Sequence, residues 1–492
     1  MKDTATPSVK NRELFPLRWR ELGGQVLITD DAGRFCWLEK EEFLQALSRP
    51  ESPQPAREKL SQAGLLRSAG AEAELEEKLR RRNAHLFSGP SLHIVILTLR
   101  CNQACIYCHA SRKPRHQPGY DMNPDTARRV LEVIFQSPSE ELTVEFQGGE
   151  PTLNFEVLKL FVEEGYARAR SQGRRIYFSL VSNLAELTDE QLDFLVDHGV
   201  MVCTSIDGPA TLHDWARKYP GDSSYRAVLQ QIERFRRAYE KRGLDTSLAY
   251  VNALVTVSRR ALQQPRQIID EYVRLGQKVV HLRPLNPFGM GQRIWRRQGY
   301  RADEFLRFYR QALQYILELN RRGVEMMEKL ASLFLIRILT DRHHNYMDLR
   351  SPCGAALGQL AYNYDGRVYS CDEGRMVGAM GDDIFCLGDV RRDSYREIIS
   401  HPCVRSLSLT SCLECLPGCS DCAYLPYCGV CPVYNYVTEG DLVARAPQNE
   451  RCLIQKGILD ELFLLLRDDE NRQLLSRWTE ERDRSPVYRP LV

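Results

Sequence analysis

Three closely spaced cysteines offer the clearest chemistry in the sequence. Cys101, Cys105 and Cys108 stand in CNQACIYC, spaced C-x3-C-x2-C, directly after an apolar run. Three thiolates can ligate three irons of a [4Fe-4S] cubane and leave the fourth iron open to a bidentate ligand. Zinc is the alternative, but structural zinc is closed by four ligands, and His109 is poorly placed to be the fourth. The spacing therefore favours a cluster with one open position.

Polar or glycine-rich residues also follow the next three apolar runs. The second run leads into FQGGEP, which contains Gly148, Gly149 and Glu150. A Gly-Gly pair allows a close approach of the backbone to a ligand, and a carboxylate can accept hydrogen bonds from an ammonium group. The third and fourth runs end in the remaining candidates, Ser182, Asn183, Ser205 and Asp207. Asp207 precedes Gly-Pro, so a turn or helix cap is an alternative role for it.

A second group of cysteines lies near the C-terminus. Of the 16 cysteines, six fall between residues 412 and 431, and three others, Cys353, Cys371 and Cys452, flank them. In a reducing compartment such cysteines are metal ligands, catalytic groups or free thiols, because disulfides are disfavoured. The run from 419 to 431 is also compatible with a zinc ribbon.

The elements that must position these residues are βα units. Between residues 91 and 287 the apolar runs LHIVILTL, LTVEFQ, IYFSLVS, VMVCTSI, LAYVNALVT and KVVHLRP alternate with helices that begin near Pro124, Asn154, Thr188, Ser224 and Pro265. This pattern predicts an α/β fold with a parallel sheet, either doubly wound or a partial barrel. Polar residues at the strand ends favour the partial (β/α)6 barrel.

Composition shifts divide the chain into five predicted units. Residues 1–86 form a small α+β unit with a hairpin and two helices, and residues 87–300 form the core. A helical bridge (301–345), a cysteine-rich domain (346–455) and a helical tail (456–492) follow.

Charge and hydropathy limit the partners. The 67 basic and 65 acidic residues nearly cancel, so no net field favours nucleic acid or an anionic membrane. The first twenty residues lack a secretory apolar stretch, and the best apolar helix, LASLFLIRILT, is too short to span a bilayer and contains Arg337. We therefore expect a cytoplasmic protein without nucleic-acid or membrane partners.

Residues 91–287 resemble the radical S-adenosylmethionine (SAM) superfamily through CNQACIYC and FQGGEP. The resemblance implies that the amine and carboxylate of SAM chelate the open iron, and that reductive cleavage yields a 5'-deoxyadenosyl radical. It places Tyr107 near the adenine, with a core aromatic as the alternative, and Glu150 near the SAM ammonium. Ser182 and Arg217 would contact the SAM carboxylate or ribose.

The C-terminal cysteines resemble the SPASM extension of that superfamily, including Gly366 before Cys371. The resemblance implies one auxiliary [4Fe-4S] cluster on Cys419, Cys422, Cys428 and Cys452, and another on Cys353, Cys371 and Cys431. The spacing departs from the family at Cys428 and Cys431, which are separated by two residues instead of three. The fourth ligand of the second cluster stays open among Cys386, Cys403, Cys412, Cys415 and an open iron.

Asp372 follows Cys371 in YNYDGRVYSCDEGRM. In sulfatase-maturing relatives an Asp at this place acts as a base on the substrate, so the resemblance implies a catalytic Asp372. A salt bridge to Arg375, three residues on, is the alternative.

The segments LRPLNPFG and PGCSDCAYLPYCGVCP, with those above, are most similar to the radical SAM maturase of the His-Xaa-Ser system. This similarity implies a ribosomally made peptide with His-Xaa-Ser repeats, a paired second maturase, an electron donor such as flavodoxin or ferredoxin, and oxidation or crosslinking of the peptide. The auxiliary clusters would accept the electron that a substrate radical must lose. The N-terminal unit weakly resembles leader-peptide recognition domains. The alternatives are a formylglycine-generating anaerobic sulfatase maturase and a non-enzymatic iron–sulfur electron-transfer or zinc scaffold protein.

Overall fold

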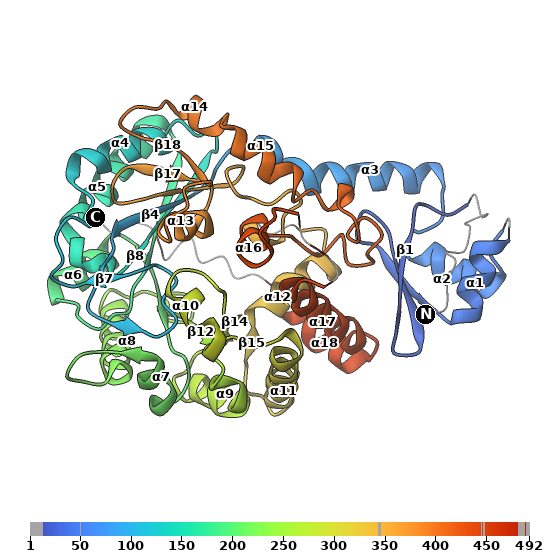
Figure 1. Cartoon of the computed structure of the whole chain (residues 1–492). Coiled ribbons are helices and arrows are strands. Elements are labelled where there is room, and N and C mark those ends of the chain that lie inside the picture. The colour runs from blue at the N-terminus through green and yellow to red at the C-terminus, as the bar shows by residue number, and fades with distance from the viewer. Residues whose placement is uncertain are drawn as a thin grey trace.

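A computed structural model describes residues 13–49, 51–342, 346–443, 445, 448–480 and 488. The ends of the predicted N-terminal unit and tail (1–12, 481–487 and 489–492) lie outside the described residues, as do residues 343–345 of the predicted bridge and 444, 446 and 447 of the cysteine-rich region. Figure 1 shows one large α/β body, with a smaller lobe built from β1, α1 and α2 at the right.

A nine-stranded sheet runs through the large body in the order β14-β12-β10-β9-β8-β4-β16-β17-β18. Its first six members are parallel and follow chain order: β4 (Leu92–Thr98), β8 (Glu141–Gly148), β9 (Arg175–Val181), β10 (Met201–Ser205), β12 (Asn252–Val257) and β14 (Leu282–Pro284). The α/β prediction is therefore confirmed. Curvature into a partial barrel stays a prediction.

The sixth predicted strand is divided in the structure. Its first half, β13 (Val279–Val280), pairs with β15 (Met327–Glu328), and its second half, β14, pairs with β12. The cysteine-rich region extends the sheet beyond β4: β16 (Gln359–Tyr362) lies parallel to β4, and β17 (Arg367–Tyr369) and β18 (Cys386–Asp389) add antiparallel strands. This extension of the sheet by β16, β17 and β18 was not predicted, because it depends on contacts between segments that are distant in the sequence.

The helices between the strands begin where their capping residues place them. The predicted members are α4 (Pro124–Ile134), α5 (Phe155–Gln172), α6 (Asp189–Asp197), α8 (Ser224–Lys241) and α9 (Pro265–Arg274). Asn123, Thr188 and Ser223 cap three of them through side-chain oxygens that accept backbone N–H groups. The sequence pattern missed α7 (Ala210–Ala216) and α10 (Met290–Gln298).

The segment predicted as a helical bridge (301–345) contains two helices in its described part. α11 (Ala302–Arg321) ends before Gly323, whose φ of 82° is easily adopted by glycine, and α12 (Lys329–Leu339) follows β15. Shorter elements lie around the strands: η1 (Ala84–Phe87), β5 (Arg100–Cys101), β6 (Ala104–Cys105), β7 (Lys113–Pro114), η2 (Pro151–Asn154), β11 (Arg217–Lys218), η3 (Ala261–Gln263), η4 (Met347–Leu349) and η5 (Leu413–Cys415). The remaining helices are α13 (Asp372–Gly378), α14 (Tyr395–Ile399), α15 (Pro402–Leu409), α16 (Pro432–Glu439), α17 (Glu450–Leu465) and α18 (Asp469–Arg477).

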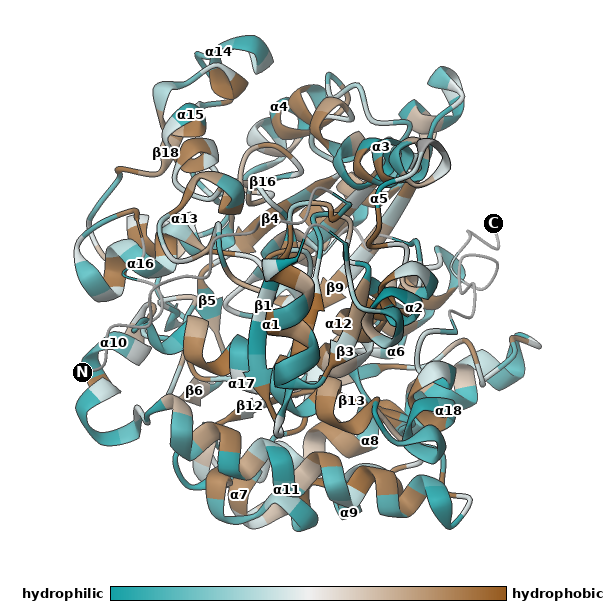
Figure 2. Cartoon of the chain, turned by 90° about the vertical axis from the view of Figure 1, so that its right-hand side faces the viewer, coloured by the Kyte–Doolittle hydropathy of each residue, from teal (hydrophilic) through white to brown (hydrophobic). Residues whose placement is uncertain are grey.

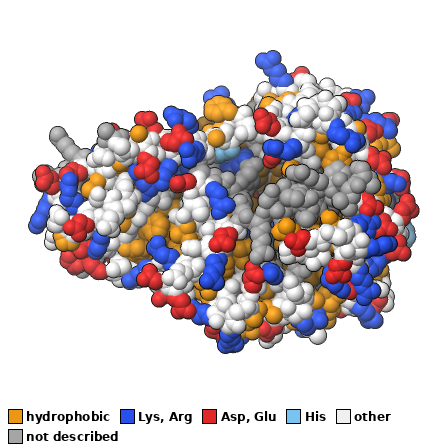
Figure 3. All heavy atoms as spheres, turned by 180° about the vertical axis from the view of Figure 1, so that it is seen from behind, with side chains coloured by type: hydrophobic (Ala, Val, Ile, Leu, Met, Phe, Trp, Pro, Cys, Tyr) orange, Lys and Arg blue, Asp and Glu red, His pale blue; other side chains and the backbone are white. Residues whose placement is uncertain are grey.

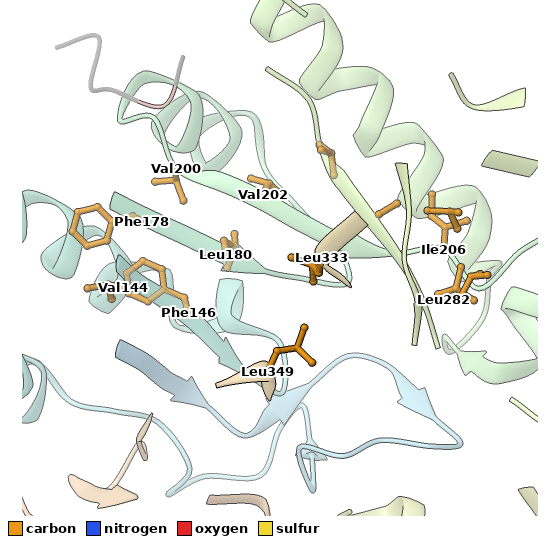
Figure 4. Close-up of a cluster of buried hydrophobic side chains, with 14 of the residues drawn as sticks. Val144, Phe146, Phe178, Leu180, Val200, Val202, Ile206, Leu282, Leu333 and Leu349 are labelled. Carbon is orange, nitrogen blue, oxygen red and sulfur yellow. The ribbon is translucent and has the colours of Figure 1, made fainter. Parts of the chain in front are cut away.

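Apolar side chains from neighbouring strands form the main core. Figure 4 shows Val144 and Phe146 of β8 near Phe178 and Leu180 of β9. The rings of Phe146 and Phe178 stack at 5.9 Å, and all four side chains are fully buried. Burial at about 25 cal/mol per Å² of apolar surface makes this core the main source of stability for the sheet that carries the polar strand ends.

The N-terminal lobe has its own small core and docks on the cysteine-rich region. It contains β1 (Arg18–Leu22), β2 (Gln25–Thr29), β3 (Phe35–Leu38), α1 (Lys40–Ser48), α2 (Gln54–Gln62) and α3 (Ala69–Asn83). The hairpin and both helices are confirmed, whereas β1 was not predicted. Thr29 Oγ1 donates to the Ala423 carbonyl at 2.8 Å, and Arg20 pairs with Asp460 of α17 at 2.7 Å. Figure 2 shows the lobe from its outer side, where α3 is coloured mainly as hydrophilic and α1 alternates between hydrophilic and hydrophobic residues.

The surface carries both signs of charge. Figure 3 shows Lys and Arg side chains interspersed with Asp and Glu over the rear face. Across the described part of the chain, no helix combines the length and apolar character needed to cross a membrane.

Candidate functional site

The three predicted cluster cysteines lie on a loop at the carboxyl end of β4. Cys101 ends β5, Cys105 ends β6, and Cys108 follows them. Gly149 N donates to the Thr98 carbonyl at 2.8 Å, which ties the FQGGEP loop to the start of the cysteine loop. A Cβ on Gly148 would lie 2.2 Å from the Thr98 oxygen, and one on Gly149 would lie 2.2 Å from the Arg100 oxygen. The two glycines therefore permit a close approach to the cysteine loop itself.

Amide groups surround the first cysteine. Gln103 N donates to Cys101 Sγ at 3.4 Å, and Asn183 Nδ2 lies 3.7 Å from the same sulfur. Asn183 Nδ2 also donates to Asn102 Oδ1 at 2.8 Å, while the buried Asn102 Nδ2 has no hydrogen-bond partner within the described chain. Burial, and then the Glu150 charge, raise the pKa of the Cys101 thiol, and burial raises that of Cys105 to about 11. These thiols stay protonated near neutral pH unless a metal displaces the protons.

Glu150 is a buried carboxylate that joins two strand ends. Its Oε1 accepts hydrogen bonds from Thr152 Oγ1 and Ser182 Oγ, both at 2.8 Å, and its Oε2 accepts from Asn183 N at 2.8 Å. Burial raises the pKa of Glu150, and these hydrogen bonds oppose the rise. The carboxylate thus holds the ends of β8 and β9 together and keeps Ser182 and Asn183 beside the cysteine loop.

Asp207 joins two other predicted residues, Tyr107 and Arg217, at the end of β10. Its Oδ2 accepts hydrogen bonds from the Tyr107 hydroxyl and from Arg217 Nε, the latter at 3.1 Å, and its Oδ1 accepts from Thr256 N at 3.1 Å. The Arg217 guanidinium lies over the Tyr107 ring at 5.4 Å, and β11 pairs Arg217 with Cys105. The alternative of a helix cap is wrong, because α7 begins after Pro209 without a side-chain cap.

The remaining strand-end residue, Ser205, is the last residue of β10 and pairs with Leu254. The structure adds a contact that the sequence did not predict, between the end of the LRPLNPFG segment and the cysteine loop: Met290 N donates to the Cys108 carbonyl at 2.9 Å, and a Cβ on Gly289 would lie 2.3 Å from the His109 oxygen. Gly289 has a φ of 56°. The glycine after the sixth strand run was the signal that could have indicated this contact.

Asp372 lies at the first turn of α13, facing the same region. Its Oδ1 accepts a hydrogen bond from Arg375 Nε at 2.9 Å in a buried ion pair, so the predicted salt bridge is present. Burial lowers the pKa of His109 to about 4, and the Asp372 charge opposes that shift; burial raises the pKa of Glu145, and the Asp372 charge adds to the rise. Glu145 on β8 is a half-buried acidic residue that the sequence pattern missed, because it alternates with core residues of a strand.

Four predicted auxiliary ligands line one cavity. Cys419, Cys422, Cys428 and Cys452 all border it, together with Cys431. Burial raises the pKa of Cys428, and the charges of Cys452, Cys422 and Cys419 raise it further, in that order. The donor chemistry of this cavity, with several convergent thiols, fits an iron–sulfur cluster.

The other three auxiliary cysteines share a buried cluster. Cys353, Cys371 and Cys431 pack together with Phe288 and Tyr434. Burial, and then the Asp348 and Asp372 charges, raise the pKa of the neighbouring Glu373 to about 7. Arg451, which pairs with Asp348 at 3.4 Å, was not predicted, although it directly precedes Cys452.

The candidates for a further ligand occupy three places. Cys403 packs against the cluster of Cys353, Cys371 and Cys431, and Cys386 lies on β18. Cys412 and Cys415 lie together, with their sulfurs 3.9 Å apart. Within the described residues, no group of three His, Cys, Asp or Glu side chains is arranged to hold a single metal ion.

Residues 95–251 match the family profile described as the radical SAM superfamily. This segment contains the cysteine loop, FQGGEP and the Asp207 network. Residues 95–251 are a radical SAM domain. The superfamily uses a [4Fe-4S] cluster and SAM, and the thiol loop with its orphaned Asn102 amide fits that cofactor pair.

Curated relatives match parts of the chain. A serine-type anaerobic sulfatase-maturating enzyme from Klebsiella aerogenes is 26% identical over 285 residues, 55% of this chain and 64% of that protein. One from Bacteroides thetaiotaomicron is 29% identical over 161 residues, 31% and 37% of the two chains. The radical SAM cyclopropyl synthase TigE from Paramaledivibacter caminithermalis is 26% identical over 172 residues, 32% and 35%. The matches thus span between about a third and just under two thirds of these relatives.

Solved structures share the fold over more of the chain. The structure described as native anSMEcpe with bound AdoMet has a TM-score of 0.63 at 18% identity and covers 78% of this chain and 99% of that one. Streptococcus suis SuiB bound to precursor peptide SuiA has a TM-score of 0.52 at 12% identity and covers 88% and 98%. These likenesses support the α/β radical SAM fold.

Proposed function

We propose that the chain is a radical SAM maturase that oxidatively modifies or crosslinks a ribosomally made peptide or protein. One observation carries the proposal. Outside the radical SAM domain, which contains the cysteine loop, the chain has a cavity lined by Cys419, Cys422, Cys428 and Cys452. Further clusters are useful to an enzyme whose product has lost hydrogen, because electrons must then leave the substrate. In this proposal a partial-barrel core (87–300) is followed by a bridge and a SPASM domain (346–455).

The roles of the core residues follow from their contacts. Cys101, Cys105 and Cys108 would hold the SAM-binding cluster, which with SAM supplies the radical that abstracts a hydrogen atom from the substrate. Gly148 and Gly149 hold the cysteine loop against the end of β8. Glu150 fixes Ser182 and Asn183 in place.

Asp207 holds Tyr107 and Arg217 beside Cys105, and keeps the buried guanidinium neutralised. Tyr107 is 5% exposed and donates its hydroxyl to Asp207, so its ring is fixed and available to border the adenine as proposed. Ser205 ends the same strand as the Asp207 loop.

The peptide substrate is supported by what similar proteins bind. Solved structures of the same fold include anSMEcpe with the Cp18Cys peptide and SuiB with its precursor peptide SuiA. A His-Xaa-Ser substrate, a paired second maturase and a flavodoxin or ferredoxin donor rest on the sequence motifs. The N-terminal lobe, docked on the cysteine-rich region through Thr29 and Arg20, would contribute to peptide recognition.

A sulfatase maturase is the second candidate, favoured by the sulfatase-maturating relatives and by Asp372 beside the radical SAM site. To act as a base on the substrate, the Asp372 carboxylate would have to break its ion pair with Arg375 or accept the substrate proton while still paired. A Cys- or Ser-type sulfatase peptide tests this candidate directly.

The test is anaerobic reconstitution followed by assays for two products. The wild type should form 5'-deoxyadenosine and convert a co-expressed His-Xaa-Ser peptide to a product lighter by about two hydrogens per event. Replacing Cys101, Cys105 and Cys108 by Ala should abolish deoxyadenosine formation and leave the auxiliary clusters in place. The Cys36→Ala variant, in the N-terminal lobe, is the matched control. Deoxyadenosine formation by the triple variant, or a mass-neutral product from the wild type, would contradict the proposal.

A further inference from the structure

A polar pocket lies at the opposite end of the sheet from the cysteine loop. Its wall includes Arg82 and His85 from α3 and η1, Ser91 just before β4, and Arg337 and Arg350 from the helical region before the cysteine-rich segment. Figure 1 shows α3 of the N-terminal lobe running toward the large body. Arg81 and Arg82 at the end of α3 line the pocket together with residues beside β4 and in β8.

Three arginines of the pocket are buried with few carboxylates near enough to balance their charges. Arg82, Arg337 and Arg350 are 6%, 9% and 6% exposed. The nearest carboxylate is Glu414, 3.8 Å from Arg82, and within the described residues neither Arg337 nor Arg350 forms an ion pair. A buried charge without a partner is costly, so two guanidinium charges in this pocket lack a counter-charge.

The hydrogen bonds of these groups are also incomplete. Arg337 Nη1 donates to backbone carbonyl groups of Leu349, Tyr427 and Cys428, but Arg337 Nε has no partner in the described chain. Arg350 Nη1 is likewise buried and unpartnered among the described residues, as is His85 Nε2. Side chains that line a cavity and keep donors without acceptors indicate that an acceptor group comes from outside the chain.

The neighbouring titratable groups agree with a positive pocket. Burial lowers the pKa of His85 to about 4, and the charges of Arg350, Arg337 and Arg82 lower it further. Arg81 and Arg175 also border the pocket, each already paired with a glutamate, Glu77 and Glu141 respectively. Glu140 at the rim is the remaining acidic lining residue. The charge left over is that of Arg337 and Arg350.

We propose that this pocket binds a phosphate group, either as free inorganic phosphate or as a phosphate monoester. A phosphate dianion matches two uncompensated guanidinium groups in charge, and its oxygens accept the forked N–H donors of arginine. The site is separate from the proposed SAM site, since Ser91, Thr143 and Arg175 of its lining lie at the starts of β4, β8 and β9, whereas the cysteine loop follows the end of β4.

The test measures thermal unfolding and binding of the anaerobically purified full chain. Inorganic phosphate should raise the midpoint temperature relative to chloride at equal ionic strength, and calorimetry should give one site per chain. Glycerol 2-phosphate is the second probe: tighter binding of this ester indicates an ester-borne phosphate as the source, and tighter binding of inorganic phosphate indicates the free ion. Absence of a phosphate-specific shift with both probes would overturn the proposal.

Two variants locate the site. Arg350→Met should weaken phosphate binding roughly tenfold or more, because a charge-assisted hydrogen bond is lost. Without phosphate it should unfold at the same temperature as the wild type or higher, since an unpaired buried charge is removed. Arg350→Gln serves the same purpose if the Met variant does not accumulate. Arg128→Met, at a half-exposed ion pair on α4, is the matched control and should bind as the wild type does. Unchanged phosphate affinity in both Arg350 variants would refute the assignment.

Discussion

Asp207→Asn tests the network that positions the radical SAM loop. The substitution keeps the shape of the side chain but removes the charge that compensates Arg217. The Asp207 and Arg217 side chains are 2% and 11% exposed, so the remaining guanidinium would be buried and unpaired. Breaking a buried ion pair in this way costs about 3–5 kcal/mol of stability.

The assay combines urea unfolding of the chain with deoxyadenosine formation. Asp207→Asn should lower the unfolding midpoint and also reduce deoxyadenosine formation, because β11 pairs Arg217 with Cys105. Asp303→Asn is the matched control. Its pair with Arg307 has side chains 57% and 61% exposed, and exposed pairs contribute about 0–1 kcal/mol.

A double variant separates charge compensation from a general loss of packing. Asp207→Asn combined with Arg217→Met should recover part of the stability lost by the single variant, because no unpaired buried charge remains. The reasoning would be refuted if Asp207→Asn were no more destabilising than Asp303→Asn, or if the double variant were less stable than the single one.

Three further changes test other parts of the structure. Gly149→Ala places a Cβ 2.2 Å from the Arg100 oxygen and should displace the cysteine loop and abolish deoxyadenosine formation, whereas Gly70→Ala, with open space around it, should not; equal activities would contradict the close approach. Burial lowers the pKa of His93 to about 3, so the unfolded chain binds a proton that the folded chain does not, and stability falls as pH drops below about 6.5 by up to about 1.4 kcal/mol per unit. Urea midpoints of His93→Gln should therefore fall less steeply than those of the wild type between pH 6.5 and 5, and parallel profiles would show that His93 is not responsible. Replacing Cys419 and Cys422 by Ala should remove about four irons per chain. The variant should keep some deoxyadenosine formation but no longer form the peptide product. An unchanged iron content would contradict the assignment of these cysteines as ligands.

Much of the candidate site could be predicted from the spacing of residues that are close in the sequence. The interval between Cys101, Cys105 and Cys108 is legible in the sequence because all three ligands belong to one short loop. The six parallel strands and most helix starts were predictable for a similar reason, since apolar periodicity and capping residues such as Thr188 act within a few residues.

The partners of the buried charges were not predictable. Tyr107 and Asp207 are 100 residues apart in the chain, and the sequence indicates an acidic residue before Gly-Pro without indicating which group it meets. Asp207 was therefore open to interpretation as a helix cap, whereas in the structure it is the counter-charge of Arg217, which β11 pairs with the cysteine-loop strand β6.

Tertiary structure alone decided the pocket of Arg82, Arg337 and Arg350. The sequence gives none of the three arginines a motif or a partner, and Arg337 was interpreted only as a charged residue within an apolar helix. Only the docking of α3 and α12 around the start of β4 buries them together, because the spacing of residues along the chain sets local geometry but not which distant surfaces meet. The sequence by itself thus indicated the cysteine spacing and the succession of strands along the chain, and the packing of distant segments determined the order of the strands in the sheet and which charges remain uncompensated.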